Sequence, residues 1–397
     1  MKKLFIVLAF LFSQFSFAQD YVHQVLVLNE GYFDFTTNQT VISPTIGSYD
    51  PINQTYTTVD TLTGARFASD MIIDGDYIYV AADNMLYKYN KNTMILTASQ
   101  NIQGIRNLAV WNDKIVVSRG DYDNTTFMPI FFNSYLQIFN TSDLSFYTEL
   151  DTISGPKWST QDMIVNDDIL YVTINNAFEF GNEKGIIGVI DISTMNYLSE
   201  IDLGPDGKNP DNLVSNGTNL YTVNNKDWTG ASISEVDIST GIATTVNISM
   251  VSTGCGTSCM KNNKIMYQIS QDTELYEWDP QLMPSSGIPM GYSQNFYELS
   301  VNETNDYLYA SNTDFFSYGT INIYDNNNML VNTFNTSVSP GKIVFDIRNM
   351  SVNISEISTE NILEGSVYDI FGKKLNSLEN ISQGIYIIDG KKVYINK

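Results

Sequence analysis

The stretch DMIIDGDYIYV at residues 70–80 decides the fold of most of the chain. An apolar run, a short polar turn and a second run of β-branched and aromatic residues predict two strands joined by a turn. Five more segments repeat this pattern, at residues 107–117, 162–172, 212–223, 258–267 and 300–309. Each copy is followed by a third strand that ends in a polar turn and by a weaker fourth strand. Successive copies start 37 to 55 residues apart, which is typical of the blades of a β-propeller.

The two ends of this region supply a seventh blade. Residues 25–29 have the pattern of the second strand, 46–50 of the third and 56–61 of the fourth, but no first strand precedes them. Residues 342–346 have the pattern of that missing strand. Pairing strands from both ends in one blade closes the ring and removes its exposed edges. We therefore predict an all-β chain with a seven-bladed β-propeller at residues 19–346.

The first 18 residues have the features of a signal peptide. Lys2 and Lys3 precede an apolar stretch at 4–12, and Ser16-Phe17-Ala18 has the small-x-small form that signal peptidase cleaves. The stretch is too short to span a bilayer, which takes about 20 apolar residues. No cysteine stands at the cleavage point, so a lipoprotein anchor is not indicated. We expect an exported protein.

The two cysteines, Cys255 and Cys259, lie close together in the sequence. In an oxidising compartment or outside the cell they can form a local disulfide, which we predict. A free dithiol in a loop and two small buried thiols are the alternatives. A zinc site would need a second pair of cysteine or histidine ligands, and the sequence does not supply one.

Composition limits the partners and the chemistry. The chain has 44 acidic and 21 basic residues, and its net charge of −23 disfavours binding to nucleic acid or to an anionic membrane. The single histidine, His23, cannot build a multi-histidine metal site and has no recurring context for a catalytic triad. Residues 121–124 and 206–211 gather oxygen ligands suited to calcium, but their spacing is not that of an EF-hand and solvated loops are the favoured interpretation. We expect no cofactor and no enzymatic activity.

Residues 347–397 differ in kind, because their charges nearly balance and their apolar strands are separated by glycine turns. We predict a small β-sandwich for this segment. The phrases VYDIFGKKL (367–375) and SQGIYII (382–388), with a last strand ending at Lys397, resemble the C-terminal sorting domain of proteins exported by the type IX secretion system of Bacteroidota. The resemblance implies that the secretion machinery reads this tail and that the propeller is released or held at the cell surface. An ordinary terminal β-domain is the alternative.

The first residues of the predicted propeller also resemble those of known proteins. The phrase VLNEGYF at residues 27–33, followed by a short strand ending Tyr49-Asp50-Pro51, resembles surface propellers of Bacteroidota in the broad YncE-like family. Some members of that family bind corrinoids such as cobalamin beside an outer-membrane TonB-dependent transporter. The resemblance therefore implies a corrinoid as ligand and such a transporter as partner.

The loops predict where a ligand binds. The loop that enters the innermost strand of a blade and the loop between its second and third strands lie on the same face, because strands alternate in direction. The second-to-third loops are the long ones, and they carry many aromatic residues, which suits recognition of a flat or apolar ligand, a sugar or a protein. Packing of loop against loop is the alternative use of these aromatic side chains.

The residues that begin the innermost strands form a second predicted feature. Aligning the copies makes Asp70, Asn107, Asp162, Asn212, Ser258 and Ser300 equivalent, in a polar ring at the channel mouth. This ring can bind a ligand, or it can bond the backbone at each loop-to-strand corner, which is the favoured interpretation. Arg66, Arg106, Arg119 and Lys157 are cations near the same entrances, suited to neighbouring acids or to an anionic group.

From both features we select these candidate ligand-binding residues: Asp70, Arg106, Asn107, Arg119, Trp158, Asp162, Phe178, Phe180, Asn212, Trp228, Phe315, Phe316 and Tyr318. The expected function is capture of a small molecule, with a corrinoid as the first choice, by a non-enzymatic protein at the cell surface. A protein-interaction or adhesion scaffold is the second possibility. A metal-dependent propeller hydrolase or lactonase is the third.

Overall fold

The computed structural model describes residues 20–249, 258–269, 273–282, 287–292 and 294–349, and five short segments of the tail. The predicted signal peptide and Cys255 lie outside the described residues. The chain divides into two units, one formed by Val22–Asp346 and the other containing Ile347–Lys397. Each unit is described by itself below.

The larger unit consists of four-stranded sheets, seven of them among the described residues. The first sheet has the order β32 (Pro340–Asn349), β1 (Asp20–Asn29), β4 (Thr45–Asp50), β5 (Thr55–Thr61). The second is β6 (Ala68–Asp74), β7 (Tyr77–Ala82), β8 (Met85–Asn90), β9 (Leu96–Asn101). The third is β10 (Ile105–Trp111), β11 (Lys114–Arg119), β14 (Ser134–Asn140), β15 (Phe146–Asp151). The fourth is β16 (Thr160–Asn166), β17 (Ile169–Ile174), β18 (Ile186–Asp191), β19 (Asn196–Asp202).

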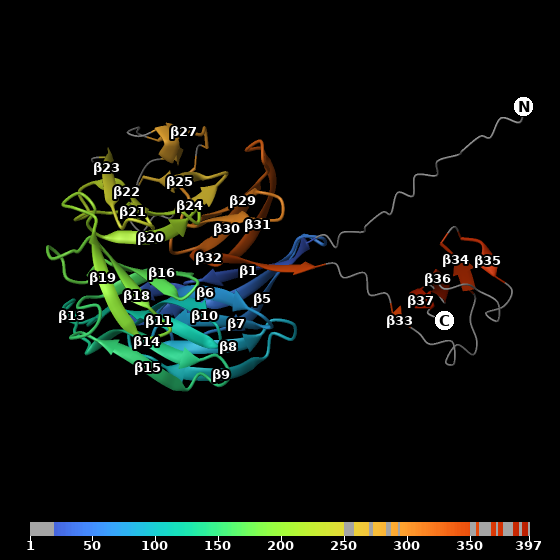
Figure 1. Cartoon of the computed structure of the whole chain (residues 1–397), viewed down its shortest axis with the longest axis horizontal. Helices are drawn as coiled ribbons and strands as arrows, with labels where there is room; N and C mark the ends of the chain where they lie inside the picture. The colour runs from blue at the N-terminus through green and yellow to red at the C-terminus, as the bar shows by residue number, and fades with distance from the viewer. Residues whose placement is uncertain are drawn as a thin grey trace, which may run out of the picture. The chain divides into compact units, whose positions relative to one another are not determined.

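The remaining sheets repeat the same order. The fifth is β20 (Pro210–Ser215), β21 (Asn219–Asn224), β22 (Ala231–Asp237), β23 (Ala243–Ser249). The sixth is β24 (Ser258–Lys261), β25 (Lys264–Gln268), β26 (Leu275–Trp278), β27 (Ile288–Pro289). The seventh is β28 (Leu299–Asn302), β29 (Tyr307–Asn312), β30 (Tyr318–Tyr324), β31 (Leu330–Val338). First strands such as β6, β10, β16 and β20 lie toward the middle, and fourth strands such as β9, β15, β19 and β23 lie at the rim (Figure 1). This arrangement is a β-propeller, as the repeat predicts.

The first sheet joins the two ends of the unit, as the sequence predicts. Strand β32 pairs with β1, so the innermost strand of this sheet comes from the C-terminal end. The carboxylate of Asp346 on β32 accepts a hydrogen bond from Gln24 Nε2 at 3.0 Å and lies 3.2 Å from Lys91 Nζ. These contacts attach β32 to the sheet it completes and to the neighbouring sheet.

The core lies between neighbouring sheets, where their inward-facing side chains interdigitate. One cluster joins Leu28 and Ile46 of the first sheet to Met71 and Val80 of the second. The repeated tyrosines of the second strands contribute to the same layers, since Tyr79, Tyr221 and Tyr267 are almost completely buried. These tyrosines therefore belong to the scaffold and not to a ligand site.

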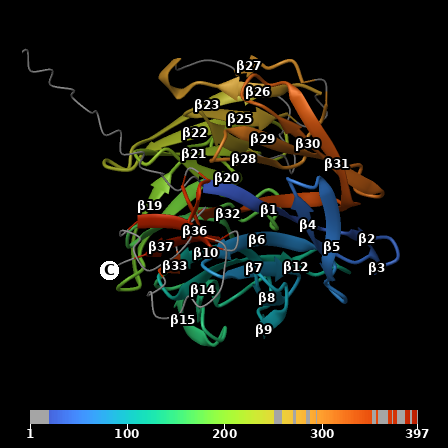
Figure 2. The same cartoon turned by 90° about the vertical axis from the view of Figure 1, so that its right-hand side faces the viewer.

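Short hairpins are inserted in two of the long second-to-third loops. Strands β2 (Tyr32–Asp34) and β3 (Gln39–Ile42) form one hairpin, and β12 (Asp121–Tyr122) with β13 (Pro129–Ile130) forms the other. The β2–β3 hairpin projects beyond β4 and β5 (Figure 2). No helix in the described part of the chain is long and apolar enough to cross a membrane.

The described tail residues form one five-stranded sheet. Its order is β33 (Ser355–Glu356), β37 (Lys391–Ile395), β36 (Gly384–Ile388), β34 (Val367–Asp369), β35 (Lys374–Leu375). The phrases singled out in the sequence form its strands, with VYD in β34 and GIYII in β36. The second layer that a sandwich needs is not among the described tail residues and stays a prediction.

Candidate functional site

A cavity of about 540 Å³ opens on the face that carries the long second-to-third loops. Its volume lies in the range of small-molecule sites, about 300–1,000 Å³. The polar lining residues come mainly from the starts of innermost strands: Ser69, Arg106, Asn107, Gln161, Asn209, Asp211, Asn212, Asn225, Glu298 and Lys342. The aromatic lining residues come mainly from the long loops: Phe35, Tyr122, Phe127, Phe178, Phe180, Trp228 and Tyr297. The two kinds of loop therefore meet on one face, as strand alternation predicts.

The aromatic wall is a set of rings in contact with one another beside a cation. The guanidinium of Arg106 lies 4.7 Å from the centre of the Phe178 ring. Phe178 lies 5.6 Å from Tyr122, which stacks on Phe127 at 6.3 Å. Phe180 is 73% exposed at the rim, so its ring is open to a ligand. A flat or apolar group entering the cavity meets ring faces and edges on this side.

Three aromatic residues of this face have a left-handed backbone. The φ angle is 56° at Phe127 and 65° at Trp228, which line the cavity, and 67° at Phe315 nearby. Non-glycine residues cost about 1–2 kcal/mol in this conformation. The loops thus hold large rings at positions where glycine would be less strained.

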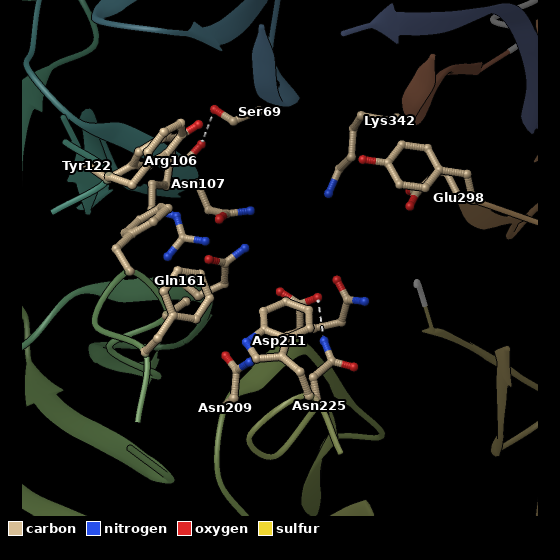
Figure 3. Close-up of a pocket in the computed structure, with 18 of the residues that line it drawn as sticks. Ser69, Arg106, Asn107, Tyr122, Gln161, Asn209, Asp211, Asn225, Glu298 and Lys342 are labelled. Atoms are coloured by element: carbon tan, nitrogen blue, oxygen red, sulfur yellow. Dashed lines mark hydrogen bonds between the residues drawn. The ribbon is translucent and has the colours of Figure 1, made fainter. Parts of the chain in front are cut away.

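The polar wall carries charges of both signs. Asn225 Nδ2 donates a hydrogen bond of 3.3 Å to Asp211 Oδ2, and Figure 3 draws this bond between two residues of the cavity lining. Burial raises the pKa of Asp211 to about 6, against the opposing effect of the positive charge of Arg106. Arg106 Nη1 is held by the backbone oxygen of Thr160 at 3.3 Å. The cavity therefore offers a fixed cation and a carboxyl group whose pKa is raised by burial.

Lys342, on the closing strand β32, faces three acids, Asp70, Asp162 and Glu298, and together these four residues form the inner wall. Its Nζ lies 3.1 Å from Asp70 Oδ1. The negative charge of Asp70, with those of Glu298 and Asp162, holds the pKa of Lys342 far above its usual value. Figure 3 shows Lys342 beside Glu298, across the cavity from Arg106. Lys342 is thus the cation that balances the inner wall.

Asp70 and Asp162 of the predicted polar ring accept hydrogen bonds from the backbone, which is the favoured interpretation of the sequence. Asp70 accepts from the N–H of Met71 at 2.9 Å and from that of Leu108, in the next sheet, at 2.8 Å. Asp162 does the same with Met163 and with Leu213 of the next sheet, both at 2.8 Å. Each aspartate therefore links two neighbouring sheets, and each stands beside a register shift at the start of its strand.

The predicted equivalence of Ser258 and Ser300 with this ring is wrong. The strand pairing aligns Glu298 with Asn107, since their backbone N–H groups donate to Ser311 Oγ and Ser118 Oγ, both at 2.9 Å. Ser300 lies two residues past this position and its hydroxyl donates to Ile343 O. Ser258 lies one residue past it. In the seventh sheet the cause is a turn between β28 and β29 that is two residues longer than the turn between β10 and β11.

Other candidates lie apart from the cavity. Arg119 is buried, donates to the backbone oxygens of Gln103 and Ser134 at 2.9 and 2.8 Å, and lies over Phe132. Burial lowers its pKa. Trp158 packs against the core cluster between the third and fourth sheets and beneath Lys184. Both residues support the scaffold next to the site and do not line it.

Phe315 and Phe316 line a second hollow of about 630 Å³ on the same face, and Tyr318 lines neither. Tyr32 meets Phe316 edge to face at 5.1 Å, and Tyr297 meets Phe315 in the same way at 4.9 Å. Phe35 and Tyr297 line both the cavity and this hollow, so the two spaces adjoin. Tyr318 is 77% exposed, at a different depression.

Glu30, the glutamate of the LNEG phrase, lies in the wall of the second hollow. Its Oε1 accepts a hydrogen bond of 2.8 Å from Tyr297 Oη. Burial raises its pKa to about 8, and the charge of Glu298 acts in the same direction. The backbone at Gly341 packs closely against this carboxyl, and a Cβ at Gly341 would overlap it.

The acidic loops considered for calcium are occupied by protein groups. Arg66 forms ion pairs with Asp83 and with Asp121, the latter at 3.3 Å. Asp123 caps the turn through the N–H groups of Thr125 and Thr126, and Asp206 pairs with Lys226 at 2.9 Å. Among the described residues no group of three or more His, Cys, Asp or Glu side chains is placed to hold a metal ion.

Only one cysteine of the predicted disulfide, Cys259, is among the described residues. Cys259 is buried and forms no disulfide with another described residue, and burial raises the pKa of its thiol to about 12. Cys255 lies outside the described residues, so the pairing stays a prediction.

Sequence reasoning missed several lining residues: Gln161, Asn209, Asp211, Asn225, Tyr297, Glu298 and Lys342. Gln161 and Asp211 stand directly before Asp162 and Asn212, just as Arg106 stands before Asn107. Arg106 is one of the predicted ligand-binding residues. The same position in the other repeats therefore predicts Gln161 and Asp211 as lining residues.

Comparison with known proteins gives the fold. No family model matches the sequence, and no curated protein matches it. A structure of a putative 6-phosphogluconolactonase from Bacteroides fragilis superposes with a TM-score of 0.58 at 13% identity, over 81% of this chain and 98% of that chain. A hypothetical selenium-binding protein from Sulfolobus tokodaii superposes with a TM-score of 0.60 at 10% identity, over 82% of this chain and 94% of that one.

The chain has the β-propeller fold. At these identities the likeness extends to the architecture alone, and the function has to be argued from the cavity.

Proposed function

We propose that this protein is a non-enzymatic binding protein that captures a small ligand in the cavity on its loop-rich face. The observation that carries the proposal is the composition of the cavity wall: aromatic rings in contact with one another on one side and amide and charged side chains on the other. Such walls bind ligands that combine a flat or apolar part with hydrogen-bonding groups. The left-handed backbone at Phe127 and Trp228 supports it, because strained residues gather at functional sites.

A corrinoid such as cobalamin or cobinamide is the first ligand to test. It combines a broad ring system with peripheral amides, and the LNEG phrase resembles that of corrinoid-binding surface propellers. The adjoining hollow, which shares Phe35 and Tyr297 with the cavity, gives room for a ligand larger than the cavity alone. Delivery to an outer-membrane TonB-dependent transporter is the corresponding role.

Export to the cell surface or out of the cell is part of the same proposal. The signal-peptide pattern of residues 1–18 and the VYDIFGKKL and SQGIYII phrases support export by the type IX secretion system and placement at the cell surface or outside the cell. Deleting residues 367–397 in the native host is expected to keep the protein from the surface.

Titration of the purified full chain with cobinamide and cobalamin, followed by visible absorption and calorimetry, tests the ligand. We expect a saturable response that Phe178→Ala weakens at least about tenfold, since one ring face is lost. The matched control is Phe146→Ala, an exposed phenylalanine on the outer strand β15, which should bind like the wild type. No response to either corrinoid would contradict the corrinoid proposal.

Docking of a protein is a second candidate, favoured by the exposed rings of Phe316 and Tyr318 on this side of the molecule. Capture of an outer-membrane protein by the wild type but not by a Phe316→Ser variant, without any small-molecule response, would favour it. A hydrolase or lactonase is the third, and it would require a bound metal. Elemental analysis finding no Ca, Mg or Zn in the active protein would argue against it.

A further inference from the structure

The cavity wall contains polar atoms that no described residue satisfies. Asn209 is 2% exposed and lines the cavity, yet its Nδ2 has no hydrogen-bond partner in the described structure. The Oε1 of Gln161, also in the wall, is buried and equally unpartnered among the described residues. Leaving a buried polar group unsatisfied costs about 1–3 kcal/mol, and native structures contain few such groups.

The two atoms are complementary in kind and come from neighbouring sheets. Asn209 precedes β20 and offers an N–H donor, while Gln161 lies on β16 and offers a carbonyl acceptor. Figure 3 shows Gln161 between Arg106 and Asn209 along one side of the cavity. A ligand that satisfies both needs a hydrogen-bond acceptor and a hydrogen-bond donor on separate atoms.

The backbone holds both residues in place without using these atoms. Asn209 has a φ of 56°, its N–H donates to Lys184 O at 2.7 Å, and its carbonyl accepts from Asn225 N at 3.0 Å. Gln161 follows Thr160, whose hydroxyl donates to Tyr135 O and accepts from Arg119 N. The side-chain amides are thus positioned by a rigid frame but are not part of it, as expected for groups that bind a ligand.

We propose, resting on the small-molecule function above, that this cavity recognises a carboxamide group of its ligand. The carbonyl oxygen of the amide accepts from Asn209 Nδ2, and its N–H donates to Gln161 Oε1. The plane of the amide lies beside Phe178, whose ring already stacks under Arg106. The amide belongs either to an N-acetylated sugar or to the side chains of a corrin ring.

Matched pairs of ligands test this on the purified full chain by calorimetry. N,N′-diacetylchitobiose is compared with cellobiose, which has hydroxyls in place of the acetamido groups. Cobinamide is compared with the heptamethyl ester of cobyrinic acid, which has esters in place of the amides. We expect one amide-bearing probe to bind at least about tenfold more tightly than its counterpart, because a site built for hydrogen bonding rejects an analogue that leaves its buried groups unpaired. The pair that shows the preference identifies the source of the amide.

Two variants test whether Gln161 and Asn209 cause the preference for the amide-bearing probe. Gln161→Met replaces the acceptor with an apolar chain of similar length, and Asn209→Asp replaces the donor with an acceptor while tolerating the positive φ. Each is expected to reduce the preference to less than about threefold. The controls are Gln137→Met, a half-buried glutamine on β14 that does not line the cavity and donates to Glu149, and Asn112→Asp, an exposed asparagine with a φ of 52° in the turn between β10 and β11. Both controls should keep the wild-type preference.

The outcomes separate this inference from the proposed function. Equal binding of both members of each pair would overturn amide recognition and leave small-molecule capture standing. A preference that persists undiminished in both Gln161→Met and Asn209→Asp would also overturn it. Failure of all four probes to bind would contradict both the inference and the ligand classes of the proposed function.

Discussion

Asp162 and Gln161 are neighbours on β16, but their side chains differ in hydrogen bonding. Both carboxylate oxygens of Asp162 accept backbone N–H groups, one of them from the next sheet. The carbonyl of Gln161 is buried and lacks a partner among the described residues. In the inner wall, meaning Asp70, Asp162, Glu298 and Lys342, the two aspartates bond the backbone of neighbouring sheets and Asp70 also pairs with Lys342. Elsewhere in the cavity wall Gln161 and Asn209 keep unsatisfied atoms among the described residues. The contrast with Asp162 separates a side chain that joins two sheets from one that a ligand in the cavity can satisfy.

The largest effect should come from removing the cation of the inner wall. Lys342→Met leaves the buried Asp70 without its ion-pair partner, and losing one side of a buried pair costs about 3–5 kcal/mol. We expect at least about 2 kcal/mol lower free energy of unfolding in chemical denaturation of the full chain, because Lys342 is partly open to the cavity. Lys226→Met, which breaks the more exposed pair with Asp206, should cost less than about 1 kcal/mol. Equal losses in the two variants would contradict the role of the inner wall.

The next effect concerns binding and not stability. Phe180→Ala removes an exposed ring at the cavity rim and should leave the free energy of unfolding within about 0.5 kcal/mol of the wild type. Affinity for the tightest-binding of the four probes should fall about five- to tenfold by calorimetry, because the aromatic ring that the ligand stacks on is lost. A variant that binds normally would place the ligand away from this rim.

The pH dependence of stability tests Glu30 in the wall of the second hollow. Its folded-state pKa of about 8 lies above the usual 4.5, so the folded protein holds a proton that the unfolded chain releases. Its contribution to stability therefore falls as the pH rises from about 4.5 through 8. Glu30→Gln keeps the oxygen that accepts from Tyr297 and removes this dependence. The Tm of the variant relative to the wild type should rise by a few degrees between pH 5 and pH 9 in thermal scans. A constant difference across this range would show that Glu30 is ionised normally.

The smallest effect is expected where the wall is unsatisfied. Gln161→Met removes an acceptor that forms no bond in the described structure, so the free energy of unfolding should stay the same or increase, by up to about 1 kcal/mol. Thermal and chemical denaturation measure this. A loss of more than about 1 kcal/mol would mean that Gln161 supports the fold, and the contrast with Asp162 would fail.

The propeller could be read from the sequence because each blade repeats one strand-turn-strand phrase. The closing sheet followed for the same reason, since residues 342–346 have the first-strand pattern. The face of the site followed from strand alternation, and Arg106, Asn107, Phe178, Phe180, Asn212 and Trp228 do line one cavity.

The finer placement depended on features that a repeat pattern does not contain. Ser300 was aligned with the ring because the turn after β28 is two residues longer than its equivalents, which shifts Glu298 into that position. Lys342 meets Asp70 only because the two ends of the unit join in one ring. The unsatisfied atoms of Gln161 and Asn209 depend on side-chain surroundings from several sheets, and no local pattern encodes them.

The central claim is that the cavity beside the inner wall is where the ligand binds. A crystal structure of the full chain soaked with the tightest-binding of the four probes tests it most directly. The account predicts ligand density between Phe178, Asp211 and Lys342, with an amide within hydrogen-bonding distance of Gln161 Oε1 and Asn209 Nδ2. Density confined to the hollow at Phe315 and Phe316, with the cavity filled by water, would contradict it.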